Sequence, residues 1–217
     1  MSDRIAIVAG GTGLVGSLLV EELLARPEWT KVVTVGRRKT GREHAKLEEQ
    51  VVDFASLGAQ ALPRAEAAFC CLGTTIKKAG SQQAFRAVDL DAVVAFARAA
   101  RAGGAERFFV VTAAGADPRS RIFYNRVKGE AEEALRQVGF ASLGIARPSL
   151  LLGERAESRP GERFAVAVSR ALRPLLAPLA ARPIEARTVA RALLAMASAP
   201  PAGPRVYSNA ELHLLGA

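Results

Sequence analysis

The feature that most constrains the fold is a glycine-rich stretch near the N-terminus, IVAGGTGLVGS at residues 7–17. It overlaps the end of an apolar run at residues 4–9 and opens a helical pattern over about 14–25. Glycines between a buried strand and a helix let the chain turn sharply and let its backbone approach a pyrophosphate, which N–H groups at the helix N-terminus bind. The stretch predicts a dinucleotide-binding βαβ unit, against the alternative of a glycine-rich turn without a ligand.

The glycines of this stretch fit two overlapping registers. Gly10, Gly13 and Gly16 match GxxGxxG, and Gly11 takes the place of Gly10 in the GxGxxG register. In either register the last glycine permits close packing of the helix on the strand. The predicted phosphate-binding loop consists of Gly10, Gly11, Thr12, Gly13, Leu14, Val15 and Gly16.

Short apolar runs alternate with helical patterns as far as residue 150. Strands are predicted at residues 4–9, 31–36, 50–53, 67–72, 107–112 and 142–147. The helices between them are predicted at about 14–25, 81–102 and 122–138. Several strands are apolar at consecutive positions, as in a parallel sheet that helices cover on both faces. This alternation predicts an α/β fold, a Rossmann-type doubly wound parallel sheet.

The pattern changes after residue 150. A polar loop with glycine and proline leads to an apolar helix near 162–172, then to a helix at 187–198 and a short strand near 205–208. A chain of 217 residues suits one domain. We therefore expect a single dinucleotide-binding domain, in which residues 150–217 form a small C-terminal lobe or lid on the substrate side.

The end of the second predicted strand bears on which dinucleotide binds. NAD-specific sites place an acidic residue about 20 positions after the glycine turn, where it holds the ribose 2′-hydroxyl. This chain has Gly36, Arg37 and Arg38 at that place. A guanidinium binds a 2′-phosphate through charge-assisted bonds worth about 1.5–3 kcal/mol, whereas a carboxylate repels it. The pattern predicts NADP(H) in preference to NAD(H), unless both arginines only face solvent.

Two further strand ends are candidates for contacts with the cofactor. Asp53 ends the third predicted strand, where its carboxylate can bind the adenine amino group. The motif CLGTT at residues 71–75 ends the fourth, with a glycine where the backbone passes under a dinucleotide. An ordinary turn at either strand end is the alternative. The residues added to the cofactor site are Asp53, Phe54, Leu72, Gly73, Thr74 and Thr75.

The stretch YNRVK at residues 124–128 suggests acid–base chemistry. Its spacing of four puts Tyr124 and Lys128 on one face of a helix. A tyrosine in water keeps its proton up to about pH 10, so a nearby cation must stabilise the phenolate before the group can exchange protons near neutrality. An aromatic residue and a lysine at this spacing are also common on helix surfaces, and the spacing alone does not separate the two interpretations.

Together with VVTAAGAD at 110–117 and ARPSLLLGERAESRPGE at 146–162, these motifs occur in the order typical of one family. Over about residues 5–165 the chain resembles the atypical short-chain dehydrogenases/reductases. The match is best with their Tat-interacting, tumour-suppressor oxidoreductase-like subgroup, for which CLGTT and ESRPGE are fairly specific.

The resemblance implies roles for particular residues. Tyr124 would donate or accept the proton, Lys128 would bind the nicotinamide ribose, and Thr112 would hold the substrate carbonyl. The nicotinamide pocket would be lined by Arg147, Pro148 and Ser149. The implied function is that of an NADPH-dependent oxidoreductase that transfers hydride to the carbonyl of a small, apolar substrate.

Two departures from the family pattern favour a second function. Ala113 and Ala114 stand where relatives of the subgroup tend to carry a serine and a lysine. Asp89 stands where many family members have an asparagine that assists a proton relay. The alternative is an NADP(H)-binding regulatory or assembly protein with little turnover, whose partner is a protein rather than a carbonyl compound. Either protein would be a monomer or a homodimer.

Composition argues against several other classes. The net charge of +9 is spread over helices that interleave arginine with glutamate, without the basic run or aromatic patch of nucleic-acid readers. The two cysteines are adjacent and the two histidines lie far apart, so a metal site is not expected. No apolar stretch approaches the roughly 20 residues that span a bilayer. We expect a cytoplasmic protein.

Overall fold

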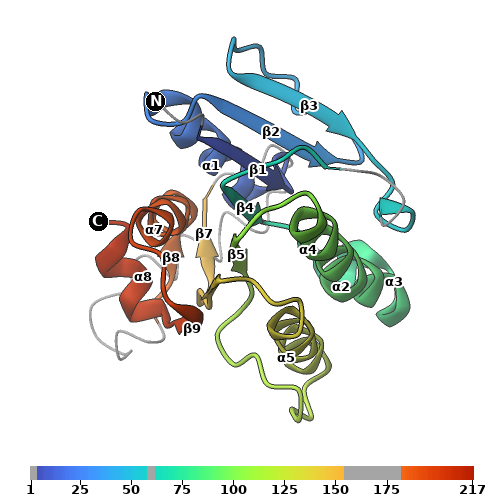
Figure 1. Cartoon of the computed structure of the whole chain (residues 1–217). Coiled ribbons are helices and arrows are strands. Elements are labelled where there is room, and N and C mark those ends of the chain that lie inside the picture. Colours follow the sequence, from blue (N-terminus) through green and yellow to red (C-terminus); the bar gives the residue numbers. More distant parts are fainter. Residues whose placement is uncertain (1–3, 58–61, 154–181) are drawn as a thin grey trace.

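The computed structural model describes residues 4–57, 62–153 and 182–217. Its centre is a seven-stranded sheet in the order β3-β2-β1-β4-β5-β6-β9, in which all neighbouring strands are parallel (Figure 1). The strands are β1 (Ile5–Ala9), β2 (Lys31–Gly36), β3 (Leu47–Val51), β4 (Ala67–Cys70), β5 (Arg107–Val111), β6 (Ser142–Ala146) and β9 (Gly203–Tyr207). A separate pair of short strands, β7 (Leu151–Leu152) and β8 (Ile184–Glu185), is also parallel.

Helices cover both faces of the sheet, with α4 and α5 on one side and α7 and α8 on the other (Figure 1). They are α1 (Leu14–Ala25), α2 (Ile76–Ala79), α3 (Gln82–Arg86), the π-helical turn η2 (Ala87–Asp91), α4 (Ala92–Ala102), α5 (Phe123–Arg136), α7 (Ala186–Ser198) and α8 (Asn209–Leu215). This arrangement confirms the predicted Rossmann-type fold.

The alternation of side chains along β1 explains why both faces are covered. Ala6 and Val8 point into the core that α1 and α7 close, and Ile7 and Ala9 point into the core that α4 closes. All four are fully buried. A strand without a polar face is stable only between two helical layers, which is the reason its apolar residues are consecutive.

The order of strands reverses beside β1, since β2 and β3 lie on one side of it and β4, β5 and β6 on the other. In open α/β sheets, ligands bind at such a switch point, outside the carboxyl ends of the strands. The residues that follow β1 and β4 are the glycine-rich stretch and CLGTT. The topology therefore brings these two motifs to one place.

Several elements differ from the sequence prediction. β3 covers residues 47–51 rather than 50–53, because an edge strand pairs on one side only and its polar sequence LEEQV needs no burial on both faces. The helix predicted at 81–102 is interrupted by the π-helical turn η2. α8 was not predicted, although its capping box of Ser208 and Glu211 is a recognisable start signal.

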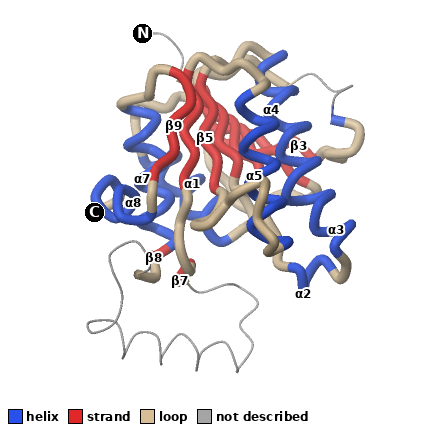
Figure 2. Tube along the Cα trace, turned by 90° about the horizontal axis from the view of Figure 1, so that it is seen from below, coloured by secondary structure: helices blue, strands red, loops and turns tan. Residues whose placement is uncertain are grey.

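The C-terminal segment contributes to the main layers. β9 is the seventh strand of the sheet and pairs with β6, and α7 packs against α1. β7 and β8 lie beyond the same end of the sheet as α2 (Figure 2). The helix predicted near 162–172 lies outside the described residues. The described part of the predicted lobe, residues 150–153 and 182–217, forms β7, β8, α7, β9 and α8.

Candidate cofactor and active site

The glycine-rich turn is shaped by close backbone contacts. Gly10 has a φ of 84°, and a Cβ added there would lie 2.6 Å from the carbonyl carbon and oxygen of Cys71. A Cβ at Gly16 would overlap the carbonyl oxygen of Gly10. Only glycine meets both demands, so this turn is packed as tightly as a pyrophosphate-binding turn requires.

Helix α1 begins with backbone donors that no side chain caps. Its N-cap is Gly13, which provides no side-chain hydrogen bond, and its first turn contains no acidic residue. The unpaired N–H groups of a helix start carry partial positive charge and attract anions. The uncapped N–H groups of α1 and the tight turn at Gly10 together fit the pyrophosphate of a dinucleotide.

Arg37 and Arg38 follow β2 next to this turn. Val35 of β2 is paired with Ala9, the residue before Gly10, so the two arginines extend just past the level of the turn. Both side chains are exposed, and neither makes an ion pair with any residue that the structure describes. Their guanidinium groups are therefore available to an anion that binds next to the glycine turn.

Asp53 and Phe54 lie in the turn after β3. The Asp53 side chain is exposed and accepts a hydrogen bond from the Ala55 N–H at 3.1 Å. Phe54 is buried in the core on the α4 side of the sheet. Asp53 is therefore accessible to a ligand, whereas the Phe54 side chain serves mainly to anchor the turn.

The loop after β4 contains Leu72, Gly73, Thr74 and Thr75. The Thr75 hydroxyl caps α2 by accepting from the Lys78 N–H at 3.1 Å. The Thr74 N–H donates to Oδ2 of Asp89 at 2.9 Å. The loop is thereby held at one end by a helix cap and in its middle by a buried carboxylate.

The predicted pair Tyr124 and Lys128 lies in the first half of α5. Lys128 is buried, and its Nζ lies 2.7 Å from Oδ1 of Asp89, which is buried as well. The half-buried Tyr124 ring packs against Phe85, with ring centroids 5.6 Å apart. A Cβ at Gly73 would lie 3.7 Å from the Lys128 ammonium. The structure therefore places Lys128 beside the loop after β4.

Thr112 is directed toward the interior. Its buried hydroxyl lies 2.8 Å from Oε1 of Glu132, to which it can donate, and 3.3 Å from the Ala146 carbonyl. Arg147 donates to both oxygens of Glu132, at 2.9 and 2.6 Å. These bonds raise the pKa of the Arg147 guanidinium above its ordinary value. Thr112 and Arg147 are thus brought together through Glu132.

Sequence reasoning missed Glu132 and did not recognise Asp89 as a partner of Lys128. Glu132 is one helical turn after Lys128 in KGEAE, and its side chain is 1% exposed. A buried glutamate is rare unless it is paired. An acidic residue at a position where α5 should face the sheet was the signal that could have revealed it.

The segment after β6 is held by α8. The Ser149 N–H donates to Oδ1 of Asn209 at 2.9 Å, and the Asn209 side chain also donates to the Arg182 carbonyl at 2.8 Å. The Pro148 carbonyl accepts from the Ala114 N–H at 2.8 Å. Arg147, Pro148 and Ser149 therefore have a fixed backbone at the carboxyl end of β6.

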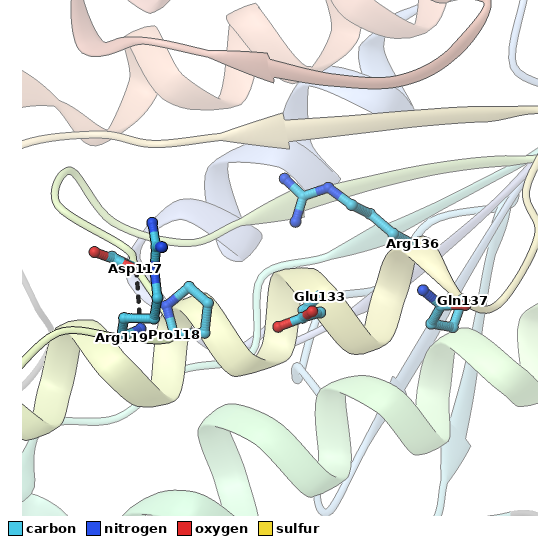
Figure 3. Close-up of a pocket in the computed structure, with 6 residues that line it drawn as sticks. All are labelled: Asp117, Pro118, Arg119, Glu133, Arg136 and Gln137. Atoms are coloured by element: carbon cyan, nitrogen blue, oxygen red, sulfur yellow. Dashed lines mark hydrogen bonds and ion pairs between the residues drawn. The ribbon is translucent and has the colours of Figure 1, made fainter.

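A hollow of about 500 Å³ lies elsewhere, along the second half of α5 (Figure 3). Its lining residues are Asp117, Pro118, Arg119, Glu133, Arg136 and Gln137. Glu133 is nine residues after Tyr124, which on a helix is the opposite face. This hollow is open and polar, and it does not belong to the site around Lys128.

The sheet order, the glycine turn at its switch point and the uncapped start of α1 define a Rossmann-type dinucleotide-binding protein. The chain belongs to the NAD(P)H-binding family, whose model matches residues 10–200. The resemblance to atypical short-chain dehydrogenases/reductases is confirmed by this match and by the relatives that follow.

Two named relatives are similar in sequence over most of the chain. Protein HTATIP2 of Rattus norvegicus is 40% identical over 170 residues, which cover 76% of this chain and 70% of that protein. The mitochondrial protein fmp52 of Emericella nidulans is 36% identical over 164 residues, which cover 72% of this chain and 70% of that protein.

Solved structures agree in fold. MoeE5 in complex with UDP-glucose and NAD has a TM-score of 0.73 at 23% identity, covering 97% of this chain and 79% of that one. The human epimerase family protein SDR39U1 with NADPH has a TM-score of 0.62 at 18% identity, covering 96% and 77%. One of these proteins holds NAD and the other NADPH, so the shared fold is compatible with either dinucleotide.

The described residues show neither a membrane-spanning helix nor a metal-binding cluster. Within residues 4–57, 62–153 and 182–217, no helix is long and apolar enough to cross a membrane. The same residues contain no group of three or more histidine, cysteine or acidic side chains that could hold a metal ion.

Proposed function

We propose that this protein is an NADPH-dependent oxidoreductase that reduces the carbonyl group of a small, apolar substrate. The observation that carries the proposal is the buried Lys128 ammonium, which lies beside the cofactor loop and one helical turn from Tyr124. Asp89 is its only acceptor among the described residues. An ammonium has three N–H donors, so donors remain for the hydroxyl groups of a ribose.

The residues can divide the chemistry between them. Bound NADPH supplies the hydride when it is present. The Tyr124 hydroxyl donates a proton to the substrate oxygen, and Lys128 stabilises the resulting phenolate across one turn of α5. Thr112 holds the substrate oxygen in this scheme, and its hydroxyl must turn away from Glu132 to do so.

The preference for NADPH over NADH rests on Arg37 and Arg38. Both are exposed beside the glycine turn without an ion-pair partner in the described part of the chain. A guanidinium that is free of carboxylates is suited to a 2′-phosphate, to which it can bind bidentately. The same surface has no acidic residue immediately after β2 that would select a 2′-hydroxyl.

Exposed apolar side chains support the choice of an apolar substrate. Ile76 follows the β4 loop, Ile122 precedes α5 and Leu150 follows β6, and they are 42, 62 and 61% exposed. All three come after the carboxyl end of a strand, where the sheet binds its ligands. An apolar compound bound there would cover side chains that otherwise face water.

The catalytic proposal is tested with the full chain. NADPH and NADH binding is measured by fluorescence titration, and consumption of NADPH is followed with a panel of aldehydes and ketones. Tyr124→Phe should retain NADPH affinity and lose turnover by about 10²-fold or more, since general acid catalysis contributes about 10²–10⁴. Full turnover by Tyr124→Phe on a substrate that the parent reduces would rule out the assigned role.

A second function is supported by the same ion pair. The Asp89 carboxylate compensates the charge of Lys128. A lysine that is compensated in this way stabilises a tyrosine phenolate less strongly. The chain could then bind NADP(H) and change its association with a protein, as a monomer or a homodimer, without consuming a carbonyl compound. Light scattering with and without NADPH separates the two functions: a cofactor-dependent change in mass without turnover supports the regulatory one.

We also propose that the protein is located in the cytoplasm. The fungal relative is called mitochondrial in its name, which says where that protein is found. Fractionation of cells that express the full-length chain, followed by detection of the protein in cytosolic and organelle fractions, decides between the two compartments.

A further inference from the structure

Asp89 connects the two halves of the proposed site. Its Oδ2 accepts the Thr74 N–H of the cofactor loop at 2.9 Å, and its Oδ1 lies 2.7 Å from the Lys128 ammonium of α5. The carboxylate is 1% exposed and the lysine side chain 6%. Among the described residues, Oδ1 has no hydrogen-bonding partner apart from this ammonium contact.

The π-helical turn η2 brings Asp89 to this position. α3 and α4 follow one another without a break in the helical backbone, and η2 (Ala87–Asp91) widens the helix between them. Widened turns of this kind are rare and are frequent at functional sites. Here the wide turn directs one carboxylate into the space between the cofactor loop and α5.

Few other charges face the site. From α3, Arg86 is already paired with Glu130 of α5 at 2.6 Å. From β4, burial raises the pKa of the Cys70 thiol to about 12, so this group is neutral in the physiological range. Asp89 and Lys128 are therefore the two buried charges with the largest effect on the protonation of Tyr124.

The remaining neighbours of Tyr124 do not change this balance. The ring of Tyr124 packs on the apolar Phe85 of α3. Arg126, the next cation in α5 after the tyrosine, donates to the backbone carbonyl of Ser120 at 2.9 Å on the outer side of the helix. Its charge is partly in solvent and is screened there.

We propose that Asp89 is a positioning residue that compensates the charge of Lys128 and thereby sets the pH range in which Tyr124 exchanges its proton. This deepens the proposed catalytic function and rests on it. An ammonium that is paired with a carboxylate stabilises a phenolate one turn away less than an unpaired ammonium does. The parent protein should therefore keep the Tyr124 proton to higher pH than the same site with Lys128 alone.

The two charges can be removed one at a time, and they should act in opposite directions. Asp89→Asn leaves an uncompensated ammonium, which favours the Tyr124 phenolate. The midpoint pH of phenolate formation should therefore fall by about one unit. Lys128→Met leaves an uncompensated carboxylate, which should raise that pH by about one unit. The double variant carries neither charge and should lie close to the parent.

The experiment is an ultraviolet absorbance titration of the phenolate in the full chain without cofactor. The chain has two tyrosines, so a Tyr207→Phe background leaves Tyr124 as the only one. Circular dichroism at each pH verifies that the protein is folded. Asp91→Asn, an exposed neighbour in the same turn, is the matched control and should leave the midpoint unchanged.

The outcomes are distinct. An Asp89→Asn midpoint that equals or exceeds that of the parent overturns the proposal, whatever the turnover of the enzyme. If the single Asp89 variant does not fold, the comparison moves to Lys128→Met, where adding Asp89→Asn must lower the midpoint, and an unchanged midpoint there also overturns it. The catalytic function is tested separately by Tyr124→Phe turnover, so failure of one proposal does not imply failure of the other.

Discussion

The two halves of the proposed site are built by different means. Around the glycine turn the structure depends on backbone atoms, and the decisive fact about Gly10 and Gly16 is that no Cβ fits. Beneath α5 it depends on buried charged side chains, where Glu132 pairs with Arg147 and Asp89 with Lys128. The first half is a matter of volume and the second a matter of charge.

This difference determines what each half is sensitive to. The tightly packed glycine turn is disrupted by one added methyl group, whereas a change in the charge of neighbouring side chains does not alter its packing. A buried ion pair tolerates little change in charge, because removing one partner leaves the other unpaired in a medium of low polarity. The following experiments test whether the two halves can be damaged independently.

The largest expected effect comes from the charged half. Glu132→Gln keeps an acceptor for the Thr112 hydroxyl and removes the charge that Arg147 binds. We expect a loss of about 3 kcal/mol in the free energy of unfolding, since breaking a buried pair costs about 3–5 kcal/mol and Arg147 can partly reach water. Urea unfolding followed by circular dichroism measures this loss.

The control for this variant is the next residue. Glu133→Gln makes the same change on the exposed face of α5 and should alter stability by less than about 0.5 kcal/mol. Equal losses for the two variants would mean that the buried network under α5 adds nothing specific.

The glycine half is tested by Gly10→Ala. The substitution combines a φ of 84° with a Cβ 2.6 Å from the Cys71 carbonyl, for which we expect about 2–3 kcal/mol of destabilisation and a loss of NADPH affinity of tenfold or more. Gly41→Ala is the matched control, because its φ is 74° and nothing lies within 4 Å of an added Cβ. If both variants bind NADPH equally well, close packing at Gly10 is not what shapes the cofactor site.

Cofactor selection should depend on the arginines beside the glycine turn. Replacing both Arg37 and Arg38 with glutamine should reduce the preference for NADPH over NADH by about tenfold or more, at about 1.4 kcal/mol per tenfold. Stability should not change, because neither side chain is paired within the described residues. The control is Arg98→Gln at an exposed position of α4, and an unaltered preference in the double variant would contradict NADP(H) selection by this pair.

The smallest effect concerns Cys70, which lies at the end of β4 between the two halves. Burial raises the pKa of its thiol to about 12, while an unfolded cysteine ionises near about 8.5. The protonated Cys70 thiol therefore makes its full contribution to the free energy of unfolding below about pH 8.5, and this contribution is lost as pH rises toward 12. Between about pH 8 and 10, under reducing conditions, the parent should lose about 1–2 kcal/mol relative to Cys70→Ala.

Parallel pH profiles for the parent and Cys70→Ala would show that this thiol ionises equally well in the folded protein. In that case the end of β4 is open to water, and the packing of the glycine turn against Cys71 would have to be looser than the contacts of Gly10 indicate.

Much of the architecture could be predicted because it depends on local pattern. Consecutive apolar residues in β1 and the glycines after it require a covered parallel strand followed by a tight turn. The edge strand β3 was harder to place, since LEEQV is polar and its pairing with β2 is visible only in the sheet. The same is true of η2, whose sequence AVDLD has no signal that separates a widened turn from an ordinary helix.

The candidate site shows the same division. Tyr124, Lys128 and the glycines could be chosen from the sequence because their spacing is short and their chemistry is explicit. Asp89 is 39 residues before Lys128 in the chain, and Glu132 binds Arg147 from another element. No local pattern reports contacts of that kind.

The sequence by itself determined the covered parallel sheet, the glycine turn and the helix that carries Tyr124 and Lys128, because period, glycine placement and spacing act over a few residues. The tertiary structure alone decided which charges meet. It paired the Lys128 ammonium with Asp89 and the Arg147 guanidinium with Glu132, because an ion pair in the interior is chosen by which side chains the folded strands and helices bring within about 3 Å of each other.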